Sequence, residues 1–542
     1  MKRLPCLLPL ATKRPDDTDS VVFAVYAPFG SDRVLSEFPD DKRKAIRQQP
    51  LVKHLLNVAR QGVHVSALID LFEDDSYLVE IPAHEPGQMA IHSAWKQRMN
   101  APQALAGFLR RTCHRFPCST VVLALEGHGA GYLPEINASA ITPDSTSGTG
   151  TVVWELKSDG ITPSKNGAPI LAIAGYPELP VESPEFIPPN LPLSTWALGF
   201  ALRSAIKDGV PRPAVIHFNN CFNMSLEVLH TVALHADFAS GYANYNFFTA
   251  GETYPEVFKE LRVQFAKSGP VTREQLAKWF AAKNGALLQA KQNHPTVGAT
   301  IALRRMAGVV AALNDLAREL TDALKSAGGN GVRGLVKTAV LAAQQFDTGQ
   351  TYQLEVPDQL TDLADFAAQL MVQFPNGAIH DKAEKLVQAL AGVWQYGGFD
   401  RPWVDENQIW DFRSQRLGVN ILFPDPAIEN LWDWRTPYYM KNLLRANEPP
   451  AQPHVIDFLN DASGRSPWVK FLIEYHRDPT QPPPPIKLLR ARPPLFPIFD
   501  RTFRPKLPHP TDKGDCPPDP NQGPGGADPG GGKPTGGSTR SA

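Results

Sequence analysis

The chain has 542 residues, enough for three or four domains at roughly 150 residues each. Hydrophobic residues make up 42% and charged residues 20%, which is typical of a globular protein with a sizeable core. The 54 Lys and Arg nearly balance the 55 Asp and Glu, so nothing indicates a basic surface for nucleic acid. No run of 18 apolar residues occurs, so we expect neither a membrane span nor a membrane partner.

The cysteines are few and odd in number, and no two of them form a CxxC pair. They are Cys6, Cys113, Cys118, Cys221 and Cys516. Such a set is typical neither of a disulfide framework nor of a structural zinc site, and it favours a reducing compartment. The apolar part of the N-terminus, residues 4–11, is short and interrupted by proline, which makes a poor signal peptide although Lys2 and Arg3 resemble its basic start. We therefore predict a cytoplasmic protein, with secretion as the alternative.

The first half of the chain alternates between short apolar runs and segments with helical spacing. The apolar runs predict strands at 21–26, 63–69, 120–125, 214–218 and 238–243. The helical segments are 41–61, which Pro50 interrupts, 101–116, 196–207 and 225–236. Strands that alternate with helices predict an α/β fold with a mainly parallel sheet.

The rest of the chain divides by composition. Residues 133–192 are loop-rich, with two β-like runs at 152–156 and 170–173. Ala- and Leu-rich segments predict helices at 272–292, 303–327, 330–347, 359–374 and 380–396, and a late strand lies within 417–424. We predict four parts: a flexible leader at 1–19, an α/β domain at 20–260, a mostly helical region at 261–480, and a largely disordered Pro/Gly-rich tail at 481–542.

Two reactive side chains follow two of the predicted parallel strands. His128 follows the strand at 120–125, and Cys221 follows the strand at 214–218. The carboxyl ends of parallel strands share one edge of a sheet, where active sites of α/β proteins collect. A neutral imidazole can take the proton of a thiol, and the N–H groups of Gly129 and Cys221 can donate to an oxyanion. We also expect the helix after Cys221 to favour its thiolate.

Each of these residues has an ordinary explanation when it is taken alone. A cysteine at a strand end is usually a small buried hydrophobe, and a histidine before glycine is usually a turn residue. Their common place at the ends of two strands is what favours the catalytic interpretation.

The segments around both residues resemble motifs of the clostripain-like cysteine peptidases, relatives of gingipains, caspases and legumain. In that family a hydrophobic strand ends in His-Gly-Gly-Gly-aromatic, and residues 123–132 here read LALEGHGAGY. A second strand ends in Asp-Ala-Cys-Leu-Met before a Glu-bearing helix, and residues 218–228 read FNNCFNMSLEV. The late segment 418–424, GVNILFP, resembles the family's glycine-strand-Phe-Pro element, so the resemblance covers roughly residues 20–475.

The resemblance implies a caspase-like αβα sandwich in which His128 and Cys221 form the catalytic dyad and Gly129 contributes to the oxyanion hole. It implies a protein or peptide substrate, no cofactor and no catalytic metal ion. Self-cleavage in the loop at 133–192 is a further implication, because the family commonly activates in that way; the alternative is an ordinary surface insertion. The acidic run 73–75 could bind calcium, as in some relatives, but it is typical of a solvated loop.

The sequence departs from the family pattern at two positions. Members that cut after Arg or Lys carry Asp two residues before the nucleophile, and this chain has Asn219 there. An amide cannot pair with a cation as a carboxylate does, so a neutral or polar side chain at the cleavage position is at least as well supported. Ala130 replaces the middle glycine. The segment 242–254 is predicted to shape the substrate pocket, with Tyr242 in it and with Glu252 as a candidate negative charge.

Three functions fit these residues. The leading hypothesis is an endopeptidase that works through an acyl-enzyme on Cys221, with His128 as its base. The second is a catalytically silent scaffold of the same fold that binds peptides or a regulatory protein partner; the altered Asn219 and Ala130 favour it, and the retained dyad speaks against it. The third is a transpeptidase that uses the same dyad.

Overall fold

The computed structural model describes the sheet, its covering helices and most of the helical C-terminal region. The described residues are 7–8, 21–28, 46–71, 75–95, 99, 101–118, 120–127, 129, 131–135, 141–144, 152–156, 171–173, 193–244, 246, 249–292, 298–346, 360–393, 403–405, 408–410, 418–423, 439–440, 455–461 and 464–477.

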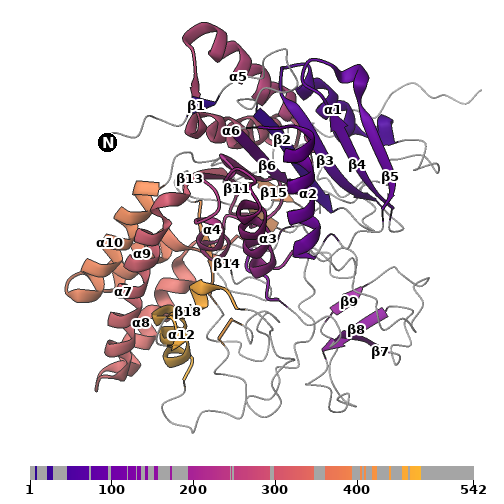
Figure 1. The fold of residues 1–542 in the computed structure, drawn as a ribbon. Coiled ribbons are helices and arrows are strands. Elements are labelled where there is room, and N and C mark those ends of the chain that lie inside the picture. The colour runs from indigo at the N-terminus through magenta and orange to yellow at the C-terminus, as the bar shows by residue number, and fades with distance from the viewer. Residues whose placement is uncertain are drawn as a thin grey trace, which may run out of the picture.

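An eight-stranded sheet forms the centre of the fold, with the order β13-β11-β10-β6-β2-β3-β4-β5 (Figure 1). Its strands are β2 (Val21–Pro28), β3 (His64–Leu71), β4 (Asp75–Ile81), β5 (Ala90–Trp95), β6 (Thr120–Leu125), β10 (Val215–Phe218), β11 (Phe238–Tyr242) and β13 (Gly298–Ala302). The five strands from β11 to β3 are parallel, and β13, β4 and β5 join the edges antiparallel. The predicted α/β fold with a mainly parallel sheet is confirmed.

Both faces of the sheet are covered, which explains why its middle strands read as continuous apolar runs. Side chains alternate along β2, so Phe23 and Val25 face one cluster of buried residues while Val22 and Tyr26 face the other. On the first face lie α1 (Pro50–Ala59), α5 (Tyr254–Ser268) and α6 (Arg273–Gln292). On the second face lie α2 (Pro102–Arg115), α3 (Thr195–Lys207) and α4 (Leu226–Val232).

The second cluster continues from the sheet into the helical C-terminal region, so the two share one core. The helices of that region are α7 (Met306–Lys325), α8 (Gly329–Ala342), α9 (Leu363–Gln373), α10 (Ala378–Val393) and α12 (Pro467–Tyr475). Their apolar spacing buries one side of each helix, as Leu313, Leu316 and Leu320 illustrate on α7. All five segments predicted to be helical between 272 and 396 are confirmed as helices.

Smaller sheets lie outside the central one. They are β1 (Leu7–Leu8) with β12 (Val271–Thr272), β14 (Leu360–Asp362) with β17 (Asn420–Leu422), β15 (Trp403–Asp405) with β16 (Gln408–Trp410), β18 (Asn460–Asp461) with β19 (Gly464–Arg465), and the three strands β7 (Ile141–Asp144), β8 (Val152–Leu156) and β9 (Leu171–Ile173). Both β-like runs predicted in the loop at 133–192 are thus strands, and so is part of the late segment 417–424.

Several elements differ from the sequence predictions. The predicted helix at 41–61 is a 3-10 turn at Ile46–Gln48 followed by α1, because Pro50 suits the first position of a helix better than its interior. The hairpin of β4 and β5 was not predicted, since its strands mix polar and apolar residues. Beyond residue 260, β13 adds an eighth strand to the sheet. The predicted division into parts stays a prediction.

Candidate active site

The ends of β6 and β10 lie side by side, as the parallel sheet predicted. The two strands pair in parallel with Leu125 opposite Phe218. The N–H of Asn219 donates to the carbonyl of Leu125 at 2.9 Å, and the N–H of Glu126 donates to the carbonyl of Tyr26 at 2.9 Å. The loops that carry the two motifs therefore leave neighbouring strands at the same edge.

The loop after β6 contacts the loop after β10 at Gly129. A Cβ atom added there would lie 2.0 Å from the carbonyl oxygen of Cys221 and 2.9 Å from its nitrogen, so only glycine allows this approach. The flanking glycines have positive φ angles, +88° at Gly127 and +65° at Gly131. His128 and Ala130 lie outside the described residues. Gly129, the residue after His128, thus lies directly against Cys221, whereas Gly127 lies against Pro28.

Cys221 is buried, with 2% of its surface exposed. Its Sγ lies 3.4 Å from both the backbone N and the backbone O of Asn246, which accepts from the thiol and donates to it. Burial raises the pKa of the thiol to about 12, more than the hydrogen bond with Asn246 lowers it. In this conformation the thiol is therefore protonated at neutral pH.

The helix after Cys221, which was expected to favour its thiolate, is short. The helix α4 begins at Leu226 and has seven residues, and the hydroxyl of Ser225 caps it by accepting from the N–H of Val228. The terminal dipole of so short a helix acts over its first turn only. Its effect on the thiol of Cys221 stays a prediction.

The residue after Cys221 has a strained backbone that the C-terminal region holds in place. Phe222 has a φ angle of +59°, which side chains rarely adopt. The side-chain amide of Asn420, in β17, donates to the carbonyls of Phe222 at 3.0 Å and Ala243 at 2.8 Å. Asn420 is fully buried. One side chain from the C-terminal region thus fastens both loops that surround Cys221.

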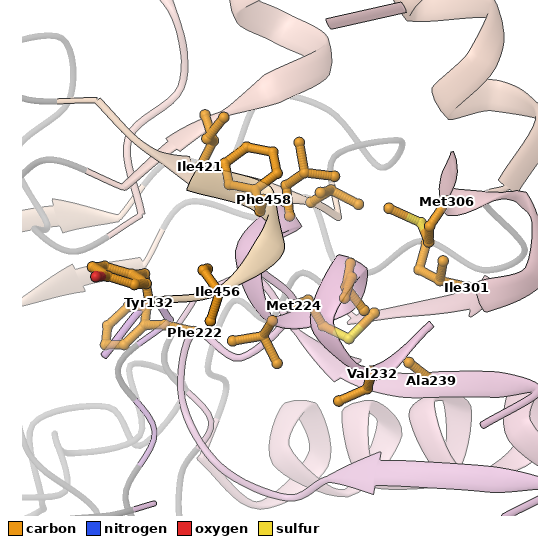
Figure 2. Packing of buried hydrophobic residues seen from close by; sticks show 14 of the residues in the cluster. Tyr132, Phe222, Met224, Val232, Ala239, Ile301, Met306, Ile421, Ile456 and Phe458 are labelled. Carbon is orange, nitrogen blue, oxygen red and sulfur yellow. The ribbon is translucent and has the colours of Figure 1, made fainter. Parts of the chain in front are cut away.

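Apolar side chains pack around the same junction. Figure 2 shows Tyr132 from the first motif and Phe222 from the second near Ile456 of the C-terminal region, within one buried cluster. A buried carboxyl adds polar contacts: Glu227, in α4, accepts from the N–H of Leu422 at 3.0 Å and from the hydroxyl of Tyr439 at 2.8 Å. The C-terminal region is therefore part of the support of the site.

A buried polar network lies behind Cys221. The amide nitrogen of Asn219 lies 3.0 Å from both carboxyl oxygens of Glu126, to which the hydroxyl of Tyr254 also donates. The amide oxygen of Asn219 accepts from Asn246 at 2.9 Å and from Asn284 at 3.5 Å. Asn284 in turn donates to the side-chain oxygen of Asn246 at 3.0 Å. Asn246 thus joins this network to the thiol.

The network changes the interpretation of Asn219. Only 5% of its surface is exposed, and both ends of its amide already have partners, so in this conformation it is not the open floor of a pocket. Glu126 is buried as well, and burial raises its pKa to about 7 against the hydrogen bonds from Tyr254 and Asn219. Sequence reasoning missed Glu126, Asn246 and Asn284, because their contacts join segments far apart in the chain.

The two other residues predicted to line the substrate pocket lie apart from the thiol contacts. Tyr242 is fully buried in β11, and its hydroxyl donates to the carbonyl of Ala281 at 3.3 Å. Glu252 is half-buried in the turn before α5, where its N–H donates to the carbonyl of Thr249 at 3.0 Å. Their role in substrate binding stays a prediction.

No metal site emerges among the residues that the structure describes: they contain no group of three or more His, Cys, Asp or Glu side chains that could hold an ion. The acidic pair Glu73 and Asp74 lies outside them. Within the same part of the chain, every helix is too short or too polar to cross a membrane.

Comparison with known proteins finds similarity only among solved structures. Neither a protein-family model nor a curated protein matches the chain. A secreted C11 cysteine protease from Bacteroides thetaiotaomicron is 12% identical and aligns with a TM-score of 0.46, over 74% of this chain and 93% of that one. An inactive zymogen C11 protease from Parabacteroides distasonis is 12% identical with a TM-score of 0.45, over 77% and 94%. At these scores the fold assignment rests on the strand order and register given above.

The comparison contradicts the predicted cytoplasmic location, because the Bacteroides protein is a secreted protease, and we withdraw that prediction. It rested on sparse, unpatterned cysteines and on a poor signal sequence, neither of which measures a compartment directly. Cys113 and Cys118 are both free thiols, and their sulfurs lie 3.6 Å apart. The solved structures that this chain resembles are C11 and clostripain cysteine proteases.

Proposed function

We propose that the protein is a cysteine peptidase that hydrolyses peptide bonds through Cys221, with His128 as the general base. The observation that carries the proposal is the close contact between Gly129 and the main chain of Cys221, since it puts the loop that bears His128 against the nucleophile. The N–H groups of Gly129 and Cys221 are then near enough to each other to serve one oxyanion.

The proposed reaction has two steps. His128 takes the thiol proton, the sulfur attacks the substrate carbonyl, and the imidazolium then gives its proton to the leaving amine. Water next attacks the acyl-enzyme with His128 again as base, which releases the acid and restores the thiol. Because Asn219 is neutral and its amide is already bonded, we expect a neutral or polar side chain at the cleavage position rather than Arg or Lys.

Catalysis requires a change at Asn246. Its backbone holds the thiol on two sides, and the raised pKa of Cys221 leaves little thiolate at neutral pH. We propose that a bound peptide displaces Asn246 and opens the sulfur to attack. Self-cleavage in the loop at 133–192 would be one route to this change, and it stays part of the proposal.

The test is the intact mass of wild type beside Cys221→Ala and His128→Ala, each incubated with a peptide-based irreversible thiol probe. We expect the probe on Cys221 in wild type, labelling slowed by at least about 100-fold in His128→Ala, and none at this position in Cys221→Ala. Fragments that occur only in wild type would map self-cleavage. Equal labelling of Cys221 in wild type and His128→Ala would refute the dyad.

The runner-up function is a catalytically silent scaffold of the same fold. The burial of the Cys221 thiol and the closed network around Asn219 favour it. It predicts that Cys221 is labelled no faster than Cys113 even when peptides are supplied, and that Cys221→Ala binds the same peptides as wild type. Probe labelling that depends on His128 excludes it.

A further inference from the structure

Two further thiols, those of Cys113 and Cys118, lie far from Cys221 in the sequence and have no role in the proposed reaction. Cys113 is in the last turn of α2 and Cys118 follows two residues after Phe116, which ends that helix. The thiol of Cys118 donates to the sulfur of Cys113 at 3.6 Å. Both are reduced and partly exposed, so a small molecule can reach them.

The chain before Cys113 and between the two cysteines is held by contacts with the core. The hydroxyl of Thr112, beside Cys113, donates to the hydroxyl of Ser66 at 2.9 Å inside the core. Phe116 is 2% exposed, its N–H donates to the carbonyl of Thr112 at 2.9 Å, and its ring stacks on His64 at 4.7 Å. The turn that returns Cys118 towards the helix is thus fixed, and the two sulfurs face each other at a high effective concentration.

The hydrogen bond between the two thiols makes their pKa values different. It lowers the pKa of Cys113, an effect larger than the opposing one of burial, and together with burial it raises the pKa of Cys118. A thiolate is the attacking species in disulfide exchange, so Cys113 is the first nucleophile and Cys118 the resolving one.

We propose that Cys113 and Cys118 are a redox site that forms an intrachain disulfide by exchange with a small-molecule disulfide such as oxidised glutathione. The Cys113 thiolate attacks one glutathione sulfur, and the first glutathione leaves as a thiolate. Cys118 loses its proton and attacks the Cys113 sulfur, which releases the second glutathione. Two cysteines are oxidised, one glutathione disulfide is reduced to two thiols, and the protons of the cysteines end on glutathione.

The experiment uses the full chain with Cys221→Ala, so that the candidate nucleophile cannot contribute. After incubation with oxidised glutathione, acid quenching and alkylation in denaturant, we expect two fewer alkylated cysteines, a loss of two hydrogens and no bound glutathione. Trypsin cuts between Arg115 and Phe116, so the product is a disulfide between the peptide Thr112–Arg115 and the peptide that begins at Phe116.

Two serine variants in the same background test the order of attack. Cys118→Ser should retain one glutathione on Cys113, because nothing resolves the mixed disulfide, whereas Cys113→Ser should react at least about 10-fold more slowly. A disulfide that instead joins Cys6 or Cys516, or a stable glutathione adduct in the parent protein, would overturn the proposal. None of these outcomes depends on peptidase activity.

Discussion

Glu126 and Asn219 form the least expected contact in the candidate site. Burial of the Glu126 carboxyl is costly, and the three hydrogens donated by Asn219 and Tyr254 offset part of that cost. Since the amide nitrogen of Asn219 is a donor to Glu126, a carboxylate at position 219 would face another carboxylate. The carboxyl of this pair thus lies on the other motif, at Glu126, two residues before His128.

Asn219→Asp tests this arrangement. Two carboxyls at hydrogen-bond distance cannot both ionise at low cost, so we expect the free energy of unfolding to fall by about 3 kcal/mol at pH 8. At pH 5 a shared proton should reduce the loss by half or more. The measurement is urea unfolding at both pH values.

The matched control is the double variant Glu126→Gln with Asn219→Asp, which reverses the donor and the acceptor. The amide introduced at position 126 can donate to the new carboxylate at position 219, so most of the stability should return at pH 8. A single variant as stable as wild type at pH 8 would mean that positions 126 and 219 do not contact each other.

Gly129→Ala probes the contact that carries the proposed function. The added Cβ would lie 2.0 Å from the carbonyl oxygen of Cys221, so one loop must shift and the two oxyanion donors separate. We expect a loss of at least about 100-fold in kcat, as for removal of one oxyanion donor. Gly331→Ala, on α8 with nothing within 4 Å, is the control and should keep wild-type activity. An active Gly129→Ala enzyme would exclude Gly129 from the oxyanion hole.

At the scale of elements, the predicted strands and their order along the chain led to most of the correct predictions about the fold. Apolar runs identified β2, β3, β6, β10 and β11, and the rule for parallel strands brought the residues after β6 and β10 to one edge. Sequence reasoning could not identify what holds those residues there. Asn420 is nearly 200 positions from Phe222 in the sequence. No local pattern predicts that its side-chain amide donates to the carbonyls of Phe222 and Ala243.

Asn420→Ala tests whether β17 positions the site through the hydrogen bonds of this side chain. The change removes two buried hydrogen bonds and leaves the carbonyls of Phe222 and Ala243 without that donor, so we expect a loss of about 2–4 kcal/mol in unfolding free energy. Because Phe222 has a strained φ angle, the nucleophile loop should relax, and kcat should fall while KM changes little.

Ile421→Val is the matched control. It shortens the neighbouring buried side chain by one carbon and keeps the hydrogen bonds of Asn420 to both carbonyls. It should cost only about 1 kcal/mol and leave kcat unchanged. If both variants lower kcat in proportion to their loss of stability, β17 supports the fold but does not position the nucleophile.

At the scale of the whole molecule, the sheet and the helical C-terminal region share one continuous core. The large cluster extends from the sheet through α4 into α7, α9 and α12, and the carboxyl of Glu227 is buried at that junction. Composition showed the change from alternating strands to Ala- and Leu-rich helices, but it could not show that both sides share a core. Burial of ionisable groups along that core follows from tertiary packing alone, and it sets how stability depends on pH.

Two sets of buried ionisable groups change the unfolding free energy with pH in opposite directions. Burial raises the pKa of three carboxyls, Glu126 to about 7, Asp362 to about 8, and Glu227. Burial lowers the pKa of five described histidines: His64 to about 4, His217 and His476 to about 3, and also His230 and His235. Below pH 6.5 the unfolded chain binds the histidine protons that the native state refuses, so acid destabilises the fold. Above pH 4.5 the unfolded chain releases carboxyl protons that the native state keeps, so rising pH destabilises it.

The five histidines outnumber the three carboxyls between about pH 4.5 and 6.5, and above that range only the carboxyls of these two sets act. Unfolding free energy should therefore not fall as pH rises across this window, and it should fall between pH 6.5 and 8, by about 2 kcal/mol from Asp362 alone. Asp362→Asn keeps the cap of α9, where Asp362 accepts from the N–H of Asp365 at 2.8 Å, but removes the titration. Urea unfolding at pH 5.5, 6.5 and 8 should show a shallower decline in this variant than in wild type. An equally steep decline would mean that Asp362 is already ionised in the folded protein at pH 6.5, and that its hydrogen bonds outweigh its burial.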